Sequence, residues 1–181
     1  QILKINNVSV GSIGTLGINT YLKKTEVKNT TLDPISLNYH LKKIKKLNIN
    51  NIIMEASSHG LKQNRLDGLK FDVGIFSNLS HDHLDYHKSY KDYLNSKLYL
   101  FEKLLKKKST IITDFNIPEY KRIKNISLKK KTKLITILNK NSDLSVISHQ
   151  YLEEKQLLKI KYKKNFYSFR LNLIGKTQVK N

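Results

Sequence analysis

Hydrophobic positions in the first two-thirds of the chain form short apolar runs that alternate with helical stripes. Two runs predict strands over residues 51–55 and 71–79, and the lack of alternation in the second run indicates burial on both faces of a sheet. A stripe of apolar positions at helical spacing follows Asp33 and Pro34, which suit the N-cap and the first turn of a helix. A second helix is expected over residues 90–107. Strands that alternate with helices predict an α/β fold with a parallel sheet.

The period of the hydrophobic positions changes to two from Thr132 onward, which indicates antiparallel hairpins in the last part of the chain. The lysine-rich stretch at 118–133 is expected to be a solvated surface connection. Near the start, residues 8–18 predict a strand that enters a glycine-rich turn. The remaining strands are predicted at residues 110–113, 134–137, 144–147, 157–162 and 166–173.

Two of the predicted strands end in side chains that can take part in chemistry. Glu55 follows the apolar run 52–54, and a group of histidines and aspartates at 81–87 follows the run 73–76. Ligand sites of open α/β sheets lie at the carboxyl ends of the strands. We therefore expect the functional site within the stretch 54–97.

The composition fits one soluble domain, with 181 residues, 39% hydrophobic residues and a formal net charge of +20. Of the 34 basic residues only Arg65, Arg122 and Arg170 are arginine. Nucleic-acid readers favour arginine, so we expect no specific nucleic-acid partner. The absence of cysteine excludes disulfides and thiolate metal sites. No apolar segment is long enough to span a bilayer and no signal peptide is visible, so we expect a cytoplasmic protein without membrane contact.

Two motifs closely resemble those of the Mur ligases, in particular the tripeptide-forming members. One is Glu-Ala-Ser-Ser-His-Gly-Leu at 55–61, and the other is Asp-His-Leu-Asp-Tyr-His at 82–87. The Asp-His pair alone also occurs in folylpolyglutamate synthetases, so the combination of motifs carries the resemblance. It implies a P-loop-type central domain, with a mostly parallel sheet flanked by helices and antiparallel hairpins toward the C-terminus. Residues 1–181 would then be part of this ATP-binding domain, truncated before the P-loop and without the N-terminal UDP-binding and C-terminal ligase domains.

The resemblance implies an ATP-dependent carboxylate–amine ligase of peptidoglycan synthesis. Such an enzyme adds a diamino acid, diaminopimelate or lysine, to UDP-N-acetylmuramoyl-L-alanyl-D-glutamate through an acyl phosphate. Its cofactors would be ATP and Mg²⁺, and we expect a monomer. Two alternatives stay open: another Mur or folylpolyglutamate-type ligase, and a non-catalytic basic binding domain.

The resemblance also implies the metal site. Mg²⁺ prefers hard oxygen ligands, and Glu55 suits that preference at the end of its strand. Imidazole is a softer ligand, so His83 is assigned to the metal by the resemblance and not by its chemistry. Lys97 would be carbamylated, which turns a cation into an oxygen ligand. His83 and the carbamylated Lys97 would also be the catalytic residues.

Substrate-binding residues follow from the same resemblance. The muramoyl peptide would be bound by Thr30, Thr31, Ser57, Gln63 and Arg65. Asn181 would bind the nucleotide cofactor, at the end of a segment that departs from the family pattern at Thr177 and Gln178.

The residues alone also permit ordinary structural roles. Thr30 and Thr31 could belong to the entry of the following helix, and Glu55 could be a surface carboxylate. Lys97 could be a snorkelling lysine whose stem covers the core. The spacing of residues in the helix around Lys97 predicts one apolar face, which contains Tyr90, Leu94, Lys97, Phe101 and Leu104.

The histidines at 81–87 also permit a rival metal site. The spacing His81-x-His83-x-Asp85-x-His87 nearly matches the motif of dinuclear zinc hydrolases. Tyr86 separates the last two ligands, which are adjacent in that motif. We therefore favour second-shell or structural roles for His81 and His87.

Overall fold

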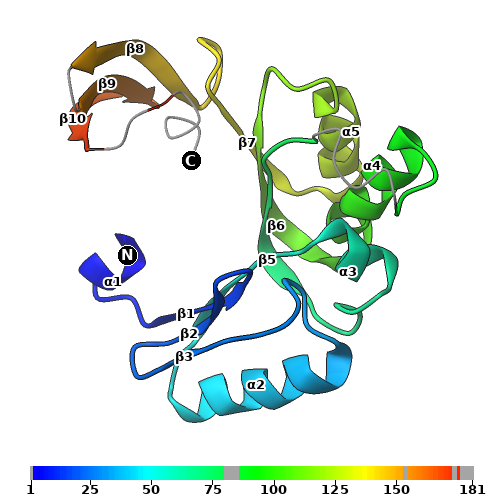
Figure 1. The fold of residues 1–181 in the computed structure, drawn as a ribbon. Helices are drawn as coiled ribbons and strands as arrows, with labels where there is room; N and C mark the ends of the chain where they lie inside the picture. Colours follow the sequence, from blue (N-terminus) through cyan, green and yellow to red (C-terminus); the bar gives the residue numbers. More distant parts are fainter. Residues whose placement is uncertain (1, 80–85, 153–154, 173–174, 176–181) are drawn as a thin grey trace. The chain divides into compact units, whose positions relative to one another are not determined.

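The computed structural model describes residues 2–79, 86–152, 155–172 and 175 (Figure 1). They form two compact units, each with its own sheet. The first unit holds the described residues within 1–70 and 81–104, and the second holds those within 71–80 and 105–181.

The first unit contains a four-stranded mixed sheet in the order β3-β2-β1-β4. β1 pairs with β4 in parallel, whereas β2 pairs with β1 and β3 in antiparallel fashion. The elements are α1 (Ile2–Ile5), β1 (Val10–Gly14), β2 (Gly17–Asn19), β3 (Lys24–Thr25), α2 (Pro34–Lys46), β4 (Asn51–Met54), α3 (Ser58–Lys62), α4 (Tyr90–Tyr99) and the π-helix η1 (Leu100–Leu104).

Helix α2 begins as the sequence predicts. The Asp33 carboxylate accepts hydrogen bonds from the backbone N–H groups of Ile35 and Ser36, both at 3.0 Å. This capping satisfies two of the amides that a helix leaves unpaired at its start. Leu37 and Ile44 on the apolar stripe are each 2% exposed, so the stripe anchors α2 in the core of the unit.

The second unit contains a six-stranded sheet in the order β10-β9-β8-β7-β6-β5. Pairing is parallel from β5 to β8 and antiparallel from β8 to β10. Helix α5 packs against β6 and β7. The elements are β5 (Phe71–Phe76), β6 (Leu105–Asp114), α5 (Tyr120–Lys130), β7 (Lys133–Ile137), β8 (Leu144–Leu152), β9 (Lys155–Tyr162) and β10 (Asn165–Leu171).

The predicted α/β class is confirmed, with antiparallel strands toward the C-terminus. Both sheets are mixed, because parallel and antiparallel pairings occur in each. The prediction that the antiparallel part begins at Thr132 is wrong for β7, which pairs in parallel with β6 and β8. None of the helices in the described ranges is long and apolar enough to cross a membrane.

The prediction that residues 71–79 are buried on both faces is wrong. β5 is an edge strand that ends at Phe76, and Val73 and Ile75 on one face are 50% and 65% exposed. Gly74 and Phe76 on the other face are buried. β4 is likewise an edge strand of its own sheet, with Ile53 57% exposed.

Two further boundaries differ from the sequence prediction. The lysine-rich stretch 118–133 contains α5, because Ile123 and Ile126 lie on one face and are buried. The helix expected over 90–107 ends with η1 at Leu104. Leu105 already belongs to β6, whose three successive lysines hide the strand pattern in the sequence.

Candidate functional site

The carboxylate of Glu55 lies directly after β4 and is held by Thr15, from the turn between β1 and β2. Glu55 Oε2 accepts hydrogen bonds from the Thr15 backbone N–H at 3.0 Å and from the Thr15 hydroxyl at 2.7 Å. The Thr15 hydroxyl also lies 3.1 Å from the hydroxyl of Thr30. The parallel pairing of Ile13 with Met54 brings these strand ends together.

The backbone beside Glu55 leaves room for this carboxylate. A Cβ atom at Gly14 would lie 2.6 Å from Cδ and 2.9 Å from Oε1 of Glu55. Glu55 is exposed, and no hydrogen bond to Oε1 is found within the described ranges. One oxygen is therefore fixed by Thr15, while the other has lone pairs available for a cation.

Thr31 is 2% exposed, and its hydroxyl is used within the protein. It donates to the backbone carbonyl of Glu55 at 3.1 Å and accepts from the backbone N–H of Ser57 at 2.9 Å. A Cβ atom at Gly60 would lie 2.6 Å from Cβ and from Cγ2 of Thr31. Thr31 thus fixes the segment that joins β4 to α3, and α3 passes close to it.

Ser57 is the N-cap of α3, and its hydroxyl accepts from the Gly60 backbone N–H at 3.1 Å. After the helix, Arg65 donates from Nε to Gln63 Oε1 and from Nη1 to the Thr31 carbonyl, both at 2.8 Å. These contacts bring the five predicted substrate-binding residues into one network with Glu55.

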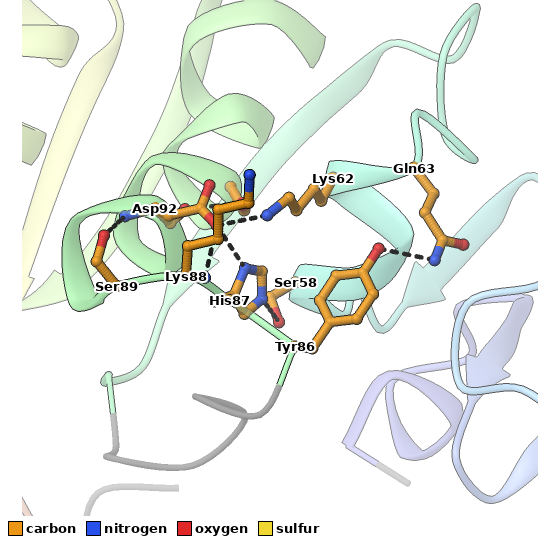
Figure 2. A network of polar contacts seen from close by, with 9 residues as sticks. Ser58, Lys62, Gln63, Tyr86, His87, Lys88, Ser89 and Asp92 are labelled. Atoms are coloured by element: carbon orange, nitrogen blue, oxygen red, sulfur yellow. Dashed lines mark hydrogen bonds and ion pairs between the residues drawn. The ribbon is translucent and has the colours of Figure 1, made fainter.

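A second network joins α3 to the start of α4 (Figure 2). The imidazole of His87 is 1% exposed, and its Nε2 lies 2.9 Å from the Ser58 hydroxyl. Its Nδ1 lies 3.7 Å from Asp92 Oδ2, which forms an ion pair with Lys62. The sequence predicts that His87 supports the site from outside the metal ligands, and it carries no signal for the contacts with Ser58 and Asp92.

Electrostatics keep this imidazole neutral. Burial lowers the pKa of His87, repulsion from Lys62 and His59 lowers it further, and the Asp92 carboxylate opposes the change. The hydrogen bond from Lys62 is the largest cause that lowers the pKa of Asp92. At neutral pH the pair therefore consists of an ionised aspartate beside a neutral histidine.

Lys97 is half-buried on α4, and its Nζ lies 5.1 Å from the centre of the Tyr93 ring. The predicted apolar face is confirmed for its neighbours Leu94 and Phe101, which are buried. The predicted apolar face is wrong for Tyr90, which is 40% exposed because it lies in the first turn of α4.

Several predicted site residues lie outside the described residues, namely His83, Asn181 and the neighbouring positions His81, Asp82 and Asp85. Across the described ranges, no group of three or more His, Cys, Asp or Glu side chains could hold a metal ion. Of the predicted metal ligands, Glu55 and Lys97 are described, and Oε1 of Glu55 suits a hard cation such as Mg²⁺. Of the rival zinc set only His87 is described, and its Nε2 already contacts Ser58.

Comparisons with known proteins identify the family and the fold of this chain. A family model described as the Mur ligase middle domain matches residues 1–181. The UDP-N-acetylmuramoyl-L-alanyl-D-glutamate--2,6-diaminopimelate ligase of Chelativorans sp. (strain BNC1) is 33% identical over 181 residues, which are 100% of this chain and 38% of that protein.

Two solved structures show the same fold. One, a UDP-N-acetylmuramoyl-L-alanyl-D-glutamate--2,6-diaminopimelate ligase, has a TM-score of 0.87 at 24% identity and is matched by 99% of this chain over 37% of its own length. The other, the MurF ligase of Thermotoga maritima in complex with ADP, has a TM-score of 0.60 at 12% identity, over 93% of this chain and 35% of its own. The chain thus spans less than two-fifths of the length of these relatives.

Proposed function

Because the chain belongs to the Mur ligase family, we propose that it acts within an ATP-dependent ligase that adds a diamino acid to UDP-N-acetylmuramoyl-L-alanyl-D-glutamate. The name of the relative from Chelativorans supports 2,6-diaminopimelate as that amino acid. One structural observation carries the proposal: Thr15 fixes the Glu55 carboxylate in a network that also contains Thr30, Thr31 and Arg65. We place this activity in the cytoplasm, in a monomer without a specific nucleic-acid partner.

The substrate-binding role falls to different atoms of the network. The hydroxyl of Thr31 already donates one hydrogen bond and accepts another within the protein, so this residue shapes the site by holding the backbone of Glu55 and Ser57. Arg65 uses Nε and Nη1 within the protein, which leaves Nη2 for a carboxylate of the peptide. Nη2 suits this role because it carries two N–H donors on a charged group, which form strong hydrogen bonds to a carboxylate. Ser57, Gln63 and Thr30 would supply the neutral hydrogen bonds.

Glu55, His83 and a carbamylated Lys97 would hold Mg²⁺ in the assembled enzyme. The ion would neutralise the ATP phosphates where they meet the substrate carboxylate, as phosphoryl transfer requires. Among the described residues, Thr15 orients the Glu55 carboxylate. Its two hydrogen bonds to Oε2 prevent the carboxylate from rotating and so fix the position of Oε1. Asn181 would contribute to the nucleotide site.

The proposal is tested in the complete ligase that carries this chain. Glu55→Ala and His83→Ala should each abolish Mg²⁺-dependent amide formation between the muramoyl dipeptide and 2,6-diaminopimelate, and Zn²⁺ should not replace Mg²⁺. Glu26→Ala is the matched control, because Glu26 is an exposed carboxylate of the same unit. Wild-type turnover by either site variant would refute the assignment of that residue.

A basic binding domain would behave differently. It would bind nucleic acid with an affinity that falls steeply with salt, and it would not bind the muramoyl dipeptide. Calorimetry with the UDP-muramoyl dipeptide and a fluorescence titration with duplex DNA distinguish the two functions. Binding of DNA alone would overturn the ligase proposal.

A further inference from the structure

Two consecutive residues, Tyr86 and His87, contact α3 and the turn that follows it. His87 Nε2 lies 2.9 Å from the Ser58 hydroxyl, in the first turn of α3. The hydroxyl of Tyr86 accepts from Gln63 Nε2 at 2.9 Å, at the C-terminal end of α3 (Figure 2). We call Tyr86 and His87 the clamp. It holds both ends of one helical turn from a single short piece of chain.

The His87 half of the clamp is rigid because its ring is enclosed. The imidazole stacks on Tyr93, with ring centres 4.8 Å apart and an interplanar angle of 22°. The rings of Tyr86 and His59 lie 5.1 and 5.6 Å away. Nδ1 faces Asp92 Oδ2 at 3.7 Å, which is beyond hydrogen-bond distance, whereas Nε2 and the Ser58 hydroxyl lie within it.

Asp92 is itself held in place. Its Oδ2 atom accepts from the backbone N–H of Lys88 at 3.2 Å and pairs with Lys62, which lies in the last turn of α3. The ion pair therefore ties α4 to α3 a second time. A buried imidazole between a fixed carboxylate and a fixed hydroxyl cannot rotate without losing a contact.

The Tyr86 half of the clamp leads directly to the substrate network. Gln63 donates to Tyr86 and accepts from Arg65 Nε, and Arg65 donates to the Thr31 carbonyl. Movement of Tyr86 would release Gln63 and so remove one of the two contacts that orient the guanidinium of Arg65.

We propose that Tyr86 and His87 are positioning residues that orient Ser57 and Arg65 toward the muramoyl peptide. The inference rests on the proposed ligase function, which it deepens by naming residues that the family resemblance did not assign to the substrate site.

The order Ser58, His87 and Asp92 resembles a nucleophile–base–acid triad, but this reading fails. Ser58 is 3% exposed and lies within α3, so no substrate carbonyl can reach its oxygen. The Asp92 carboxylate lies 3.7 Å from Nδ1 and pairs with Lys62. The set is therefore a structural tie and not a catalytic one.

The test uses two matched pairs of variants in the complete ligase. Ser58→Ala removes the His87 contact, and Ser127→Ala removes a buried serine hydroxyl of the second unit that is also 3% exposed and bonds Thr132. Tyr86→Phe removes the Gln63 contact, and Tyr99→Phe removes a tyrosine hydroxyl that bonds Asp67 in the first unit.

The kinetic readout separates positioning from stability. Ser58→Ala and Tyr86→Phe should each raise KM for the UDP-muramoyl dipeptide roughly fivefold to tenfold, as expected for one lost hydrogen bond, with KM for ATP unchanged. The two controls should leave both constants unchanged. His87→Gln, whose amide can still reach Ser58, should retain more affinity than His87→Ala.

Amide hydrogen exchange supplies a readout that does not need catalysis. The Gly60 and Arg65 amides, which bond Ser57 Oγ and the Gly60 carbonyl, should exchange faster in Ser58→Ala and Tyr86→Phe than in either control. Equal amide exchange rates and equal KM values in all four variants would refute the positioning role of the clamp. Faster exchange in a protein whose wild type does not bind the dipeptide would instead refute the ligase function and leave the clamp standing.

Discussion

Thr15 donates two hydrogen bonds to the same oxygen of Glu55, one from its backbone at 3.0 Å and one from its hydroxyl at 2.7 Å. The glutamate is an exposed side chain at a strand end, where a carboxylate ordinarily samples several rotamers. Two bonds to one atom fix its direction and leave the other oxygen for a ligand. The geometry of this pair therefore decides how well Glu55 can serve a metal ion.

Gly14→Ala should impair the complete ligase through Glu55. The added methyl would lie 2.6 Å from Glu55 Cδ, so the carboxylate must move, and misplacement by about 1 Å can cost roughly a hundredfold in rate. Gly11→Ala in the same strand is the control, because its nearest contacts are ordinary ones of 3.6 and 3.7 Å. The measurement is the Mg²⁺ dependence of turnover, and equal behaviour of the two variants would contradict the prediction.

Lys97 is expected to be carbamylated in the active ligase. Lys97→Ala should lose nearly all activity and regain part of it with acetate or another short carboxylate, which can replace the missing oxygen ligand. Lys97→Arg keeps the charge but cannot take up CO₂, so it should also be inactive.

Carbon-13 NMR after incubation with labelled bicarbonate tests the modification directly. The expected result is one carbamate signal that is absent from Lys97→Arg and present in Lys91→Arg, a change of an exposed lysine on the same helix. Full activity of Lys97→Arg at limiting Mg²⁺ would disprove the role.

Acid should destabilise the chain through His87. Its pKa is lowered in the folded state, so the unfolded state binds the proton more readily below the ordinary value of 6.5. The contribution of neutral His87 to the free energy of unfolding is therefore complete above that value. It decreases as the pH falls below that value toward the lowered pKa of the folded state. Asp92, whose pKa is also lowered, adds a second loss at more acidic pH.

Urea unfolding at several pH values between about 7.5 and 5 measures how the free energy of unfolding depends on pH. The free energy of unfolding should fall with pH in the wild type and fall less in His87→Gln, which has no imidazole to protonate. His40→Gln on α2 measures a separate contribution, because burial lowers the pKa of His40 as well. An unchanged slope in His87→Gln would contradict the prediction, and a slope that disappears in His40→Gln alone would assign the effect to His40.

Exposed isoleucines on an edge strand of each sheet should promote association when the 181-residue chain is produced alone, outside the complete ligase. Strands β4 and β5 each expose isoleucine at an edge, and such edges pair with other strands. Ile53→Lys and Ile75→Lys should reduce the weight-average mass in sedimentation experiments and change stability by no more than about 0.5 kcal/mol. Ile35→Lys is the control, because Ile35 is 84% exposed but lies on a helix.

Local signals in the sequence predicted the start of α2 and the strand β4, because each depends on neighbouring residues. Burial of β5 could not be predicted in this way. An apolar run identifies a strand, but whether it lies at the edge or the centre of a sheet depends on long-range pairing.

The site was predicted in part. The motif at 55–61 pointed to Glu55 and Ser57, and the structure places them in one network with Thr31. The contact between Thr15 and Glu55 spans 40 residues and follows from the parallel pairing of β1 with β4, which the sequence does not state. No sequence signal linked Asp92 to His87, since the contact depends on how α4 begins.

The close approach of Gly60 to Thr31 constrains which of these two positions can be substituted first during evolution. A side chain at position 60 would overlap Cβ of residue 31, so only glycine at position 31 would make room for it. That exchange would remove the hydroxyl that bonds Ser57 and the Glu55 carbonyl. Thr31 therefore forbids a side chain at position 60, and any change there must follow the loss of the Thr31 hydroxyl and of its two hydrogen bonds.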